Sequence, residues 1–236
     1  MSETWIEERP EIDFLHELGS RIAASDPLRE VLDRVVSFVS KVIRCDSCFI
    51  YVLEGNDLLL RASKNPHPDV VDRLKLQVGQ GITGWVAEHR QPVTVAHNAS
   101  QDPRFRAFNE LPEDSFEAFL SVPILSRGIL VGVINLQNRQ PHTHTRRETQ
   151  LISTIGFLVG AEIAMARLEN ENSELSERLE TRKLIERAKG VLQRELGISE
   201  EQAYLTLQKH SRQRRRPMKE VAEAIRLSDD LKRIEN

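Results

Sequence analysis

The chain has 236 residues and a formal net charge of −3, with 39% hydrophobic and 29% charged residues. This length fits one medium and one small domain, and this composition supports a packed core with a soluble surface. Residues 1–10 are acidic without an apolar core, and the apolar stretch 151–166 is interrupted by Ser153, Thr154 and Glu162, so we expect neither a signal peptide nor a membrane span.

The two cysteines and the uneven distribution of charge further limit the possible functions. Cys45 and Cys48 lie three residues apart, and a single pair is a weak signal for zinc, so we interpret them as buried, reduced thiols of a cytoplasmic protein. Residues 181–236 hold 14 Lys and Arg against 9 Asp and Glu, whereas the other residues hold 19 against 27. A basic tail on an acidic body indicates a polyanionic partner for the tail alone.

Residues 12–150 predict helices followed by an antiparallel sheet. Helical spacing predicts a helix over 11–24 with Ile12, Leu15, Leu18 and Ile22 on one face, and Asp26 with Pro27 predicts the start of the next helix. Strands are expected at 49–53, 58–60, 93–96, 118–125 and 129–137. Short turns between several of these strands favour antiparallel pairing, so the expected fold class is α+β.

Four motifs in this region resemble the GAF family of sensor domains. In chain order they are Gly79-Gln80-Gly81-Ile82-Thr83-Gly84-Trp85-Val86-Ala87, Asp102-Pro103-Arg104-Phe105, Ser121-Val122-Pro123-Ile124 and Gly132-Val133-Ile134-Asn135-Leu136. The resemblance covers about residues 12–168 and implies a GAF-like antiparallel sheet flanked by helices. It does not name a ligand, because GAF domains bind diverse small molecules or none. We interpret the three glycines as a sharp structural turn before a helix.

The sequence identifies no cofactor. It is compatible with either a small molecule or a protein as the signal that the GAF-like domain senses. Tyr51, Trp85 and Phe119 are the residues that we expect to wall a ligand pocket. Of the signature of cyclic-nucleotide-binding GAF domains only Asn135 and Glu148 remain. Cys45 and Cys48 lie together near the first strand, which does not fit a GAF-fold methionine sulfoxide reductase. No catalytic set is evident, so we expect no enzyme, and we interpret His142 and His144 as surface residues rather than metal ligands.

Residues 151–180 predict a coiled-coil helix that joins two modules. Alternating steps of three and four form a narrow a/d seam that suits a parallel homodimer. The seam residues are Leu158, Ala161, Met165, Leu168, Asn172, Leu175 and Leu179. Asn172 falls on an a position, where its amide is best satisfied by its copy in a second chain. A solvated linker helix is the alternative.

Residues 181–228 predict a bundle of three short helices. The first helix carries an apolar stripe of Leu184, Ile185, Ala188, Val191, Leu192 and Leu196, and Gly197 ends it. Ser199 to Gln202 form a capping box that opens the second helix, with Ala203, Tyr204 and Leu207 available to face inward. Pro217 begins the third helix, whose inward residues are Met218, Val221, Ala222 and Ile225.

This stretch resembles the ANTAR family of RNA-binding antiterminator domains. The resemblance rests on residues 185–192 (Ile-Glu-Arg-Ala-Lys-Gly-Val-Leu), Ala203-Tyr204, Leu207, Arg216 and Val221-Ala222. It implies binding to paired RNA hairpins, whose formation displaces a transcription terminator. The sequence departs from the family at Gln208 and Ser211. The predicted RNA-binding residues are Arg187, Lys189, Gly190, Lys209, Arg212, Arg214, Arg215, Arg216 and Lys219.

The resulting hypothesis is a cytoplasmic, signal-responsive antitermination regulator that binds a two-hairpin RNA as a homodimer, without a membrane. One alternative is a DNA-binding regulator that uses the C-terminal helices as a helix-turn-helix. Against it, the capped helix carries mostly Glu, Gln, Ala and Leu, which read bases poorly. The other alternative is a small-molecule enzyme with a GAF fold. Against it, the sequence shows no nucleophile–base pair.

Overall fold

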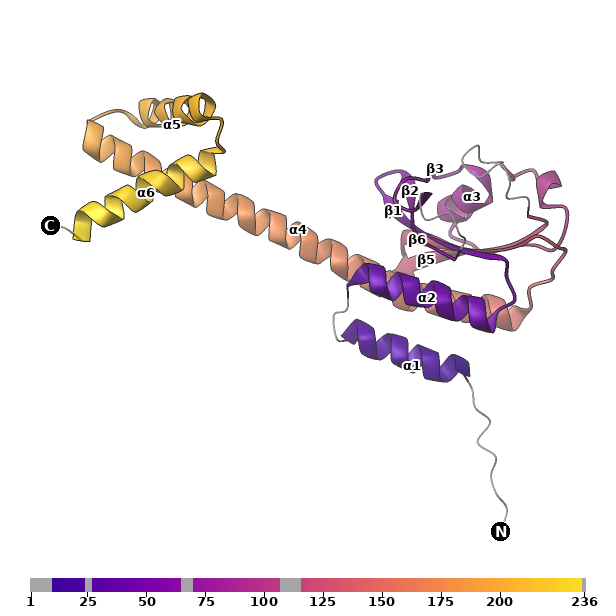
Figure 1. Cartoon of the computed structure of the whole chain (residues 1–236). Coiled ribbons are helices and arrows are strands. Elements are labelled where there is room, and N and C mark those ends of the chain that lie inside the picture. Colours follow the sequence, from indigo (N-terminus) through magenta and orange to yellow (C-terminus); the bar gives the residue numbers. More distant parts are fainter. Residues whose placement is uncertain (1–9, 24–26, 65–69, 107–115, 235–236) are drawn as a thin grey trace, which may run out of the picture. The chain divides into compact units, whose positions relative to one another are not determined.

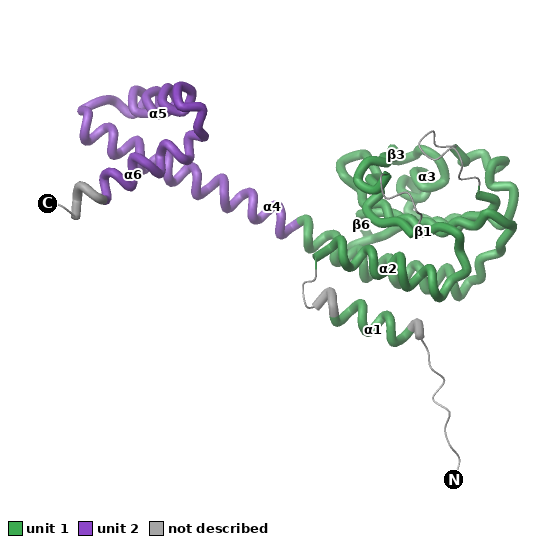
Figure 2. Tube along the Cα trace, in the orientation of Figure 1, with its two compact units in different colours: residues 1–167 green, residues 168–236 purple. Residues whose placement is uncertain are grey.

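The computed structural model describes residues 10–23, 27–64, 70–106 and 116–234. They belong to two compact units (Figure 2), the sheet unit, which ends at Arg167, and the helical unit, which begins at Leu168. Helix α4 (Arg146–Leu196) has 51 residues and supplies both units. The expected domain boundaries at 150 and 180 therefore both fall within one uninterrupted helix.

The sheet unit contains a six-stranded antiparallel sheet of order β3-β2-β1-β6-β5-β4. Its strands are β1 (Ser47–Glu54), β2 (Asp57–Ser63), β3 (Lys75–Gln77), β4 (Val93–Val95), β5 (Ala118–Ser126) and β6 (Ile129–Asn138). The predicted hairpins β1–β2 and β5–β6 are confirmed. Strand β3 was not predicted, because its three residues contribute a single buried side chain, Leu76, which is too little for an alternating pattern.

Helices cover both faces of this sheet (Figure 1). Helix α2 (Leu28–Val42) and the first part of α4 pack on one face, and α3 (Gly81–His89) lies on the other. Helix α1 (Pro10–Ala23) packs against α2 through Phe14, whose ring stacks on Phe38 with centroids 3.4 Å apart. Ile12, which was expected to face inward, is 55% exposed, since Phe14 and Leu18 make the contact. The side chain of Ile22 and all of Asp26 lie outside the described residues.

The first part of α4 is long and apolar enough to cross a membrane when judged by length and composition alone. Four of its branched apolar side chains, however, are buried within the protein. Ile152, Ile155, Val159 and Ile163 are buried in the core between this helix, α2 and the sheet. Packing within the sheet unit therefore accounts for part of the apolar character of the segment.

The glycine-rich motif forms the tight turn that was expected before α3. Gly81 has φ +69°, a conformation that favours glycine, and a Cβ atom on Gly84 would lie 2.5 Å from the carbonyl oxygen of Gln77. A hydrogen-bond chain then fastens α3 to the sheet. Ser121 donates to Asn135 Oδ1 and Asn135 donates to Thr83 Oγ1, both over 2.6 Å.

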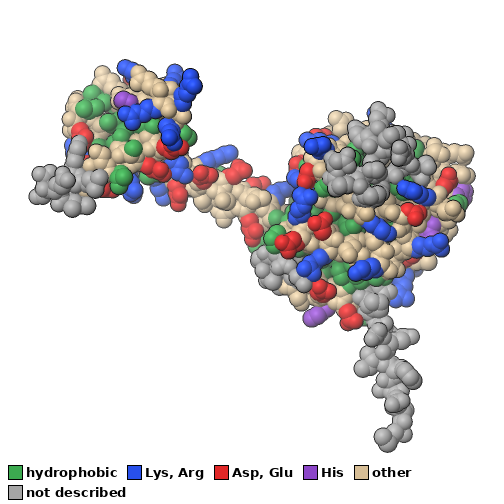
Figure 3. Space-filling view, in the orientation of Figure 1, with side chains coloured by type: hydrophobic (Ala, Val, Ile, Leu, Met, Phe, Trp, Pro, Cys, Tyr) green, Lys and Arg blue, Asp and Glu red, His purple; other side chains and the backbone are tan. Residues whose placement is uncertain are grey.

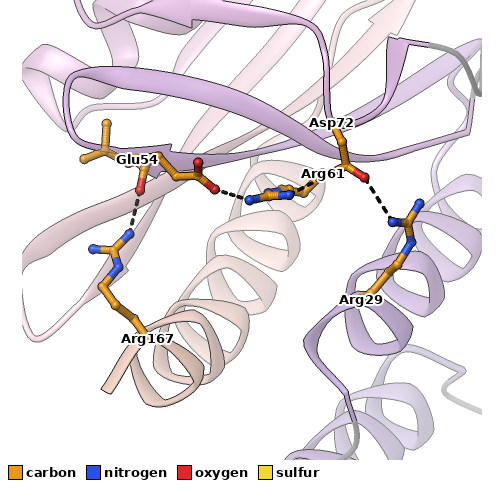
Figure 4. A network of polar contacts seen from close by, with 6 residues as sticks. Arg29, Glu54, Arg61, Asp72 and Arg167 are labelled. Atoms are coloured by element: carbon orange, nitrogen blue, oxygen red, sulfur yellow. Dashed lines mark hydrogen bonds and ion pairs between the residues drawn. The ribbon is translucent and has the colours of Figure 1, made fainter. Parts of the chain in front are cut away.

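A polar network ties the outer edge of the sheet unit to its helices (Figure 4). Asp72 accepts from Arg29 of α2 over 3.0 Å and from Arg61 of β2 over 2.8 Å, and Arg61 also pairs with Glu54. The hydrogen bond from Arg61, followed by that from Arg29, holds the pKa of Asp72 below its usual range. Beside this network, Arg167 donates to the carbonyl oxygen of Leu53 over 2.5 Å and fastens α4 to β1.

The helical unit consists of the end of α4, α5 (Glu200–Arg214) and α6 (Met218–Ile234). Its core contains the buried residues Ala188, Leu192, Ala203, Leu207 and Ala222. Gly197 has φ +65°, and both halves of the capping box at Ser199 and Gln202 are present. The predicted helix ends in this part of the chain are therefore confirmed.

Candidate nucleic-acid interface

Two apolar side chains that were expected in the core of the helical unit lie on its surface. Tyr204 is 42% exposed and Leu196 is 58% exposed, although both were expected to face inward. The small core leaves no room for them. Ala203 and Leu207, one turn apart, make the inward face of α5, and Tyr204 projects about 100° around the helix from Ala203.

The predicted RNA-binding residues differ in accessibility. Seven of them are exposed, Lys219 is half-buried and Lys189 is buried. The exposed ones are Arg187, Gly190, Lys209, Arg212, Arg214, Arg215 and Arg216. Lys219 bonds Glu177 of α4 over 3.3 Å, so part of its charge serves to join α6 to α4.

Three consecutive arginines project from a tight turn between α5 and α6. Arg215 has φ +51° and ends α5, and the backbone N–H of Arg216 donates to the carbonyl oxygen of Ser211 over 3.0 Å. The Ser211 hydroxyl donates back to the carbonyl oxygen of Arg216 over 2.6 Å. These two bonds fix the backbone, so three guanidinium groups leave a defined turn rather than a flexible charge run.

A groove with an apolar floor lies beside this turn. We call it the α5–α6 groove, and its lining residues are Leu192, Leu196, Thr206, His210, Arg214, Arg216, Glu220, Val221, Ala224 and Ile225. Figure 3 shows hydrophobic, cationic and histidine side chains next to one another on the visible face of this unit. The sequence patterns did not identify His210 or Leu196 as members of such a site, because they belong to different helices.

Lys189 is held by two carboxylates. Its ammonium donates to both oxygens of Glu186, over 3.0 and 2.8 Å, and to Glu200 Oε1 over 2.7 Å. The hydrogen bonds to Glu186 and then to Glu200 raise the pKa of Lys189, and Lys189 lowers the pKa of Glu200. Since an ammonium has three donors, these bonds use them all and join α4 to the start of α5.

The expected sensor residues all lie on the α3 side of the sheet. Tyr51 and Phe119 belong to the buried core on that side, and burial raises the pKa of Tyr51. Trp85 is half-buried and stacks on His89 with ring centroids 4.0 Å apart. The Arg104 guanidinium lies 4.9 Å from the Trp85 ring centroid, and Asp102 holds that guanidinium in place over 2.8 Å. Both charged residues belong to the Asp-Pro-Arg-Phe motif at residues 102–105.

His144 is buried, contrary to the expected surface position. Together with His142 and Glu148 it offers metal-ligating atoms that lie within 4.8 Å of one another. Burial, followed by the neighbouring His142, lowers the pKa of His144 to about 4.

The seam residues beyond the sheet unit are exposed. Leu158 packs partly against the core of the sheet unit, and Ala161 and Asn172 are exposed. Four large apolar side chains are more than half exposed: Met165 at 55%, Leu168 at 61%, and Leu175 and Leu179 at 57% each. Phe157, which the heptad spacing leaves out, is 54% exposed near the same stripe.

Comparisons with known proteins agree with this division. The GAF domain model matches residues 27–163 and the ANTAR domain model matches residues 173–225. The transcriptional regulatory protein PdtaR of Mycobacterium tuberculosis is 46% identical over 77 residues, which are 33% of this chain and 38% of that protein. The chain thus spans about two fifths of the length of this relative.

Solved structures identify the fold of the sheet unit. The GAF domain of a phosphoenolpyruvate-protein phosphotransferase from Coxiella burnetii superposes with a TM-score of 0.63 at 26% identity, covering 68% of this chain and 96% of that one. The free methionine-R-sulfoxide reductase of Neisseria meningitidis shares the fold alone, with a TM-score of 0.56 at 14% identity over 67% of this chain and 91% of that one. The chain belongs to the GAF family and carries an ANTAR domain after its GAF domain.

Proposed function

We propose that this protein is a signal-responsive transcription antitermination regulator that binds paired RNA hairpins through its ANTAR domain. The observation that carries the proposal is the ANTAR match over residues 173–225, on a helical unit that presents three arginines beside an apolar groove. The relative from Mycobacterium tuberculosis is named a transcriptional regulatory protein, in keeping with this role.

The α5–α6 groove has the chemistry to bind an unpaired RNA base. Readers of RNA sequence bind splayed loop bases by stacking and edge contacts, while arginines neutralise the phosphates. Leu196 and Ile225 offer an apolar floor, His210 offers a ring, and Arg214 and Arg216 stand at the rim. We therefore propose that a loop base enters the groove and that its phosphates contact Arg214 to Arg216.

The predicted RNA contact at Lys189 requires an exchange of partners. A phosphate can bind this ammonium only if it displaces one of the two carboxylates, and Glu200, whose side chain is 68% exposed, is the more accessible of them. Glu186 and Glu200 can thereby act as substitutes for phosphate in the unbound protein. Gly190, exposed beside Lys189, lets an RNA backbone approach the helix closely.

A parallel homodimer held by the seam would place two ANTAR domains at the same end. Each domain then binds one hairpin, and linkage of two weak sites raises affinity by roughly 10²–10⁴ where geometry allows both. This arrangement accounts for a requirement for paired rather than single hairpins.

For the GAF domain we propose a role in sensing. An enzymatic role has less support. Cys45 and Cys48 are buried in the core on the α2 side of the sheet, away from the residues on the α3 side that were expected to wall a pocket. Burial raises the pKa of both thiols, which lowers their reactivity. The signal itself is either a small molecule or a protein partner.

The decisive experiment compares three nucleic acids by fluorescence anisotropy at fixed salt: a two-hairpin RNA, one of its hairpins and a DNA duplex. We expect tightest binding to the two-hairpin RNA and weak binding to the single hairpin. Tighter binding to duplex DNA would replace this proposal with a DNA-binding regulator.

A further inference from the structure

A second cluster of chemically active side chains lies in the sheet unit, at the start of α4. His142 and His144 stand in the loop before the helix, and Glu148 lies in its first turn. The two imidazole rings meet edge to face with their centroids 4.6 Å apart. One ligand atom of each of the three residues lies within 4.8 Å of the others.

Three of the four ring nitrogens of this cluster are buried without a hydrogen-bond partner within the part of the chain that the structure describes. His144 is only 8% exposed, and both of its ring nitrogens are buried without a partner, as is Nε2 of His142. Buried polar groups are nearly always satisfied, and leaving one unsatisfied costs free energy. Three such nitrogens in one place indicate that the cluster has an external partner.

We propose that His142, His144 and Glu148 bind one divalent first-row transition-metal ion, with Zn²⁺ as the representative. Two imidazoles and one carboxylate form a donor set that suits Zn²⁺, with water as a fourth ligand. Mg²⁺ and Ca²⁺ prefer oxygen ligands, so the histidines select against them. This proposal concerns the sheet unit and is independent of RNA binding.

The geometry permits this coordination after small side-chain rotations. Ligand atoms about 2.1 Å from a tetrahedral ion lie about 3.4 Å from one another, so the longest edge of the cluster has to shorten. The helix cap survives this change. Thr145 donates its backbone N–H and its hydroxyl to Glu148 Oε2, over 2.6 and 3.0 Å, and a metal can bind Oε1.

The local electrostatics favour a cation on balance. The start of a helix carries about half a positive charge, which opposes a metal ion there. The full negative charge of Glu148, whose carboxylate lies within 4.8 Å of the imidazole nitrogens, opposes this effect. The backbone at His142 is also held in place, since its N–H donates to the carbonyl oxygen of Ala96 over 2.9 Å.

The test uses the full chain after chelator treatment, titrated with Zn²⁺ and with Co²⁺. We expect one ion per chain, a higher melting temperature with Zn²⁺, and a Co²⁺ spectrum without thiolate charge transfer. His144→Phe should weaken Zn²⁺ binding by more than about 100-fold, because loss of a direct ligand exceeds the loss of a supporting contact. Glu148→Gln should weaken binding while it keeps the capping box.

His97→Ala is the matched control, because His97 is exposed in the same unit. It should bind Zn²⁺ like the parent chain. His144→Phe should also keep or raise the melting temperature in chelator, since a phenyl ring suits a buried apolar position, and this separates loss of metal from loss of fold. Absence of stoichiometric binding, thiolate charge transfer with Co²⁺, or equal weakening by the control would overturn the proposal.

Discussion

Exchange of Leu168 and Leu175 for lysine should convert the proposed dimer into monomers. Burying a leucine stabilises by ~1.5–3 kcal/mol. These two side chains are 61% and 57% exposed in the single chain, so pairing can bury roughly three fifths of each. That corresponds to ~1–2 kcal/mol per side chain and ~4–7 kcal/mol for the four leucines of a dimer. The dissociation constant should rise by about 10³–10⁵.

Sedimentation equilibrium over a range of concentrations measures this constant directly. The matched control is Asn170→Lys with Ser173→Lys, which adds the same charge to exposed positions of the same helix outside the seam. We expect the control to stay dimeric. A monomeric parent chain, or a double leucine variant that remains dimeric, would refute the seam. Asn172→Leu should raise dimer stability and broaden the distribution of oligomers, because a buried amide at an a position restricts oligomer choice.

Three further predictions concern the other charged groups. Arg214→Ala with Arg216→Ala should weaken binding to hairpin RNA and reduce the slope of log affinity against log salt by about one to two; an unchanged slope would mean that neither contacts phosphate. Glu200→Gln should raise RNA affinity several-fold by releasing Lys189, whereas unchanged affinity in the same anisotropy assay would assign Lys189 to the α4–α5 junction alone. Asp72→Asn should cost about 0.5–1 kcal/mol of unfolding free energy at pH 7, measured in urea, a modest value because the pair is exposed. Since the folded pKa of Asp72 is lowered, its contribution is present above the ordinary carboxyl pKa and disappears as the pH falls through the folded value; a difference that persists at low pH would point to another cause.

The sequence predicted elements that depend on local rules. Asp26 with Pro27 was predicted to begin a helix, and α2 begins at Leu28 with Val31, Val35 and Val39 buried at helical spacing. Gly197 and the Ser199 capping box are local signals for a helix end and a helix start, and both are confirmed. These features need only neighbours in the sequence, which explains the agreement.

Features that depend on distant packing were not predictable in this way. The positions of Tyr204 and Leu196 depend on how little space three short helices enclose, and the periodicity does not contain that information. The ion pairs of Lys189 depend on where α5 begins in space relative to α4. His144 lies in a polar stretch of sequence, yet its side chain is buried, because the loop folds back on the sheet unit.

The hydrogen bond from Arg167 to Leu53 is the last described contact between α4 and the sheet. Beyond it, the equilibrium between helix and coil decides how well α4 stays folded. Residues 168–180 of the helix are all exposed, so this stretch draws its stability from its own backbone bonds and from side-chain contacts such as the bond between Lys219 and Glu177. Isolated helices of this length are marginal in water. In the proposed dimer, pairing of the seam would protect this stretch, so its amide protons should exchange with solvent more slowly as protein concentration rises, and their exchange would report self-association.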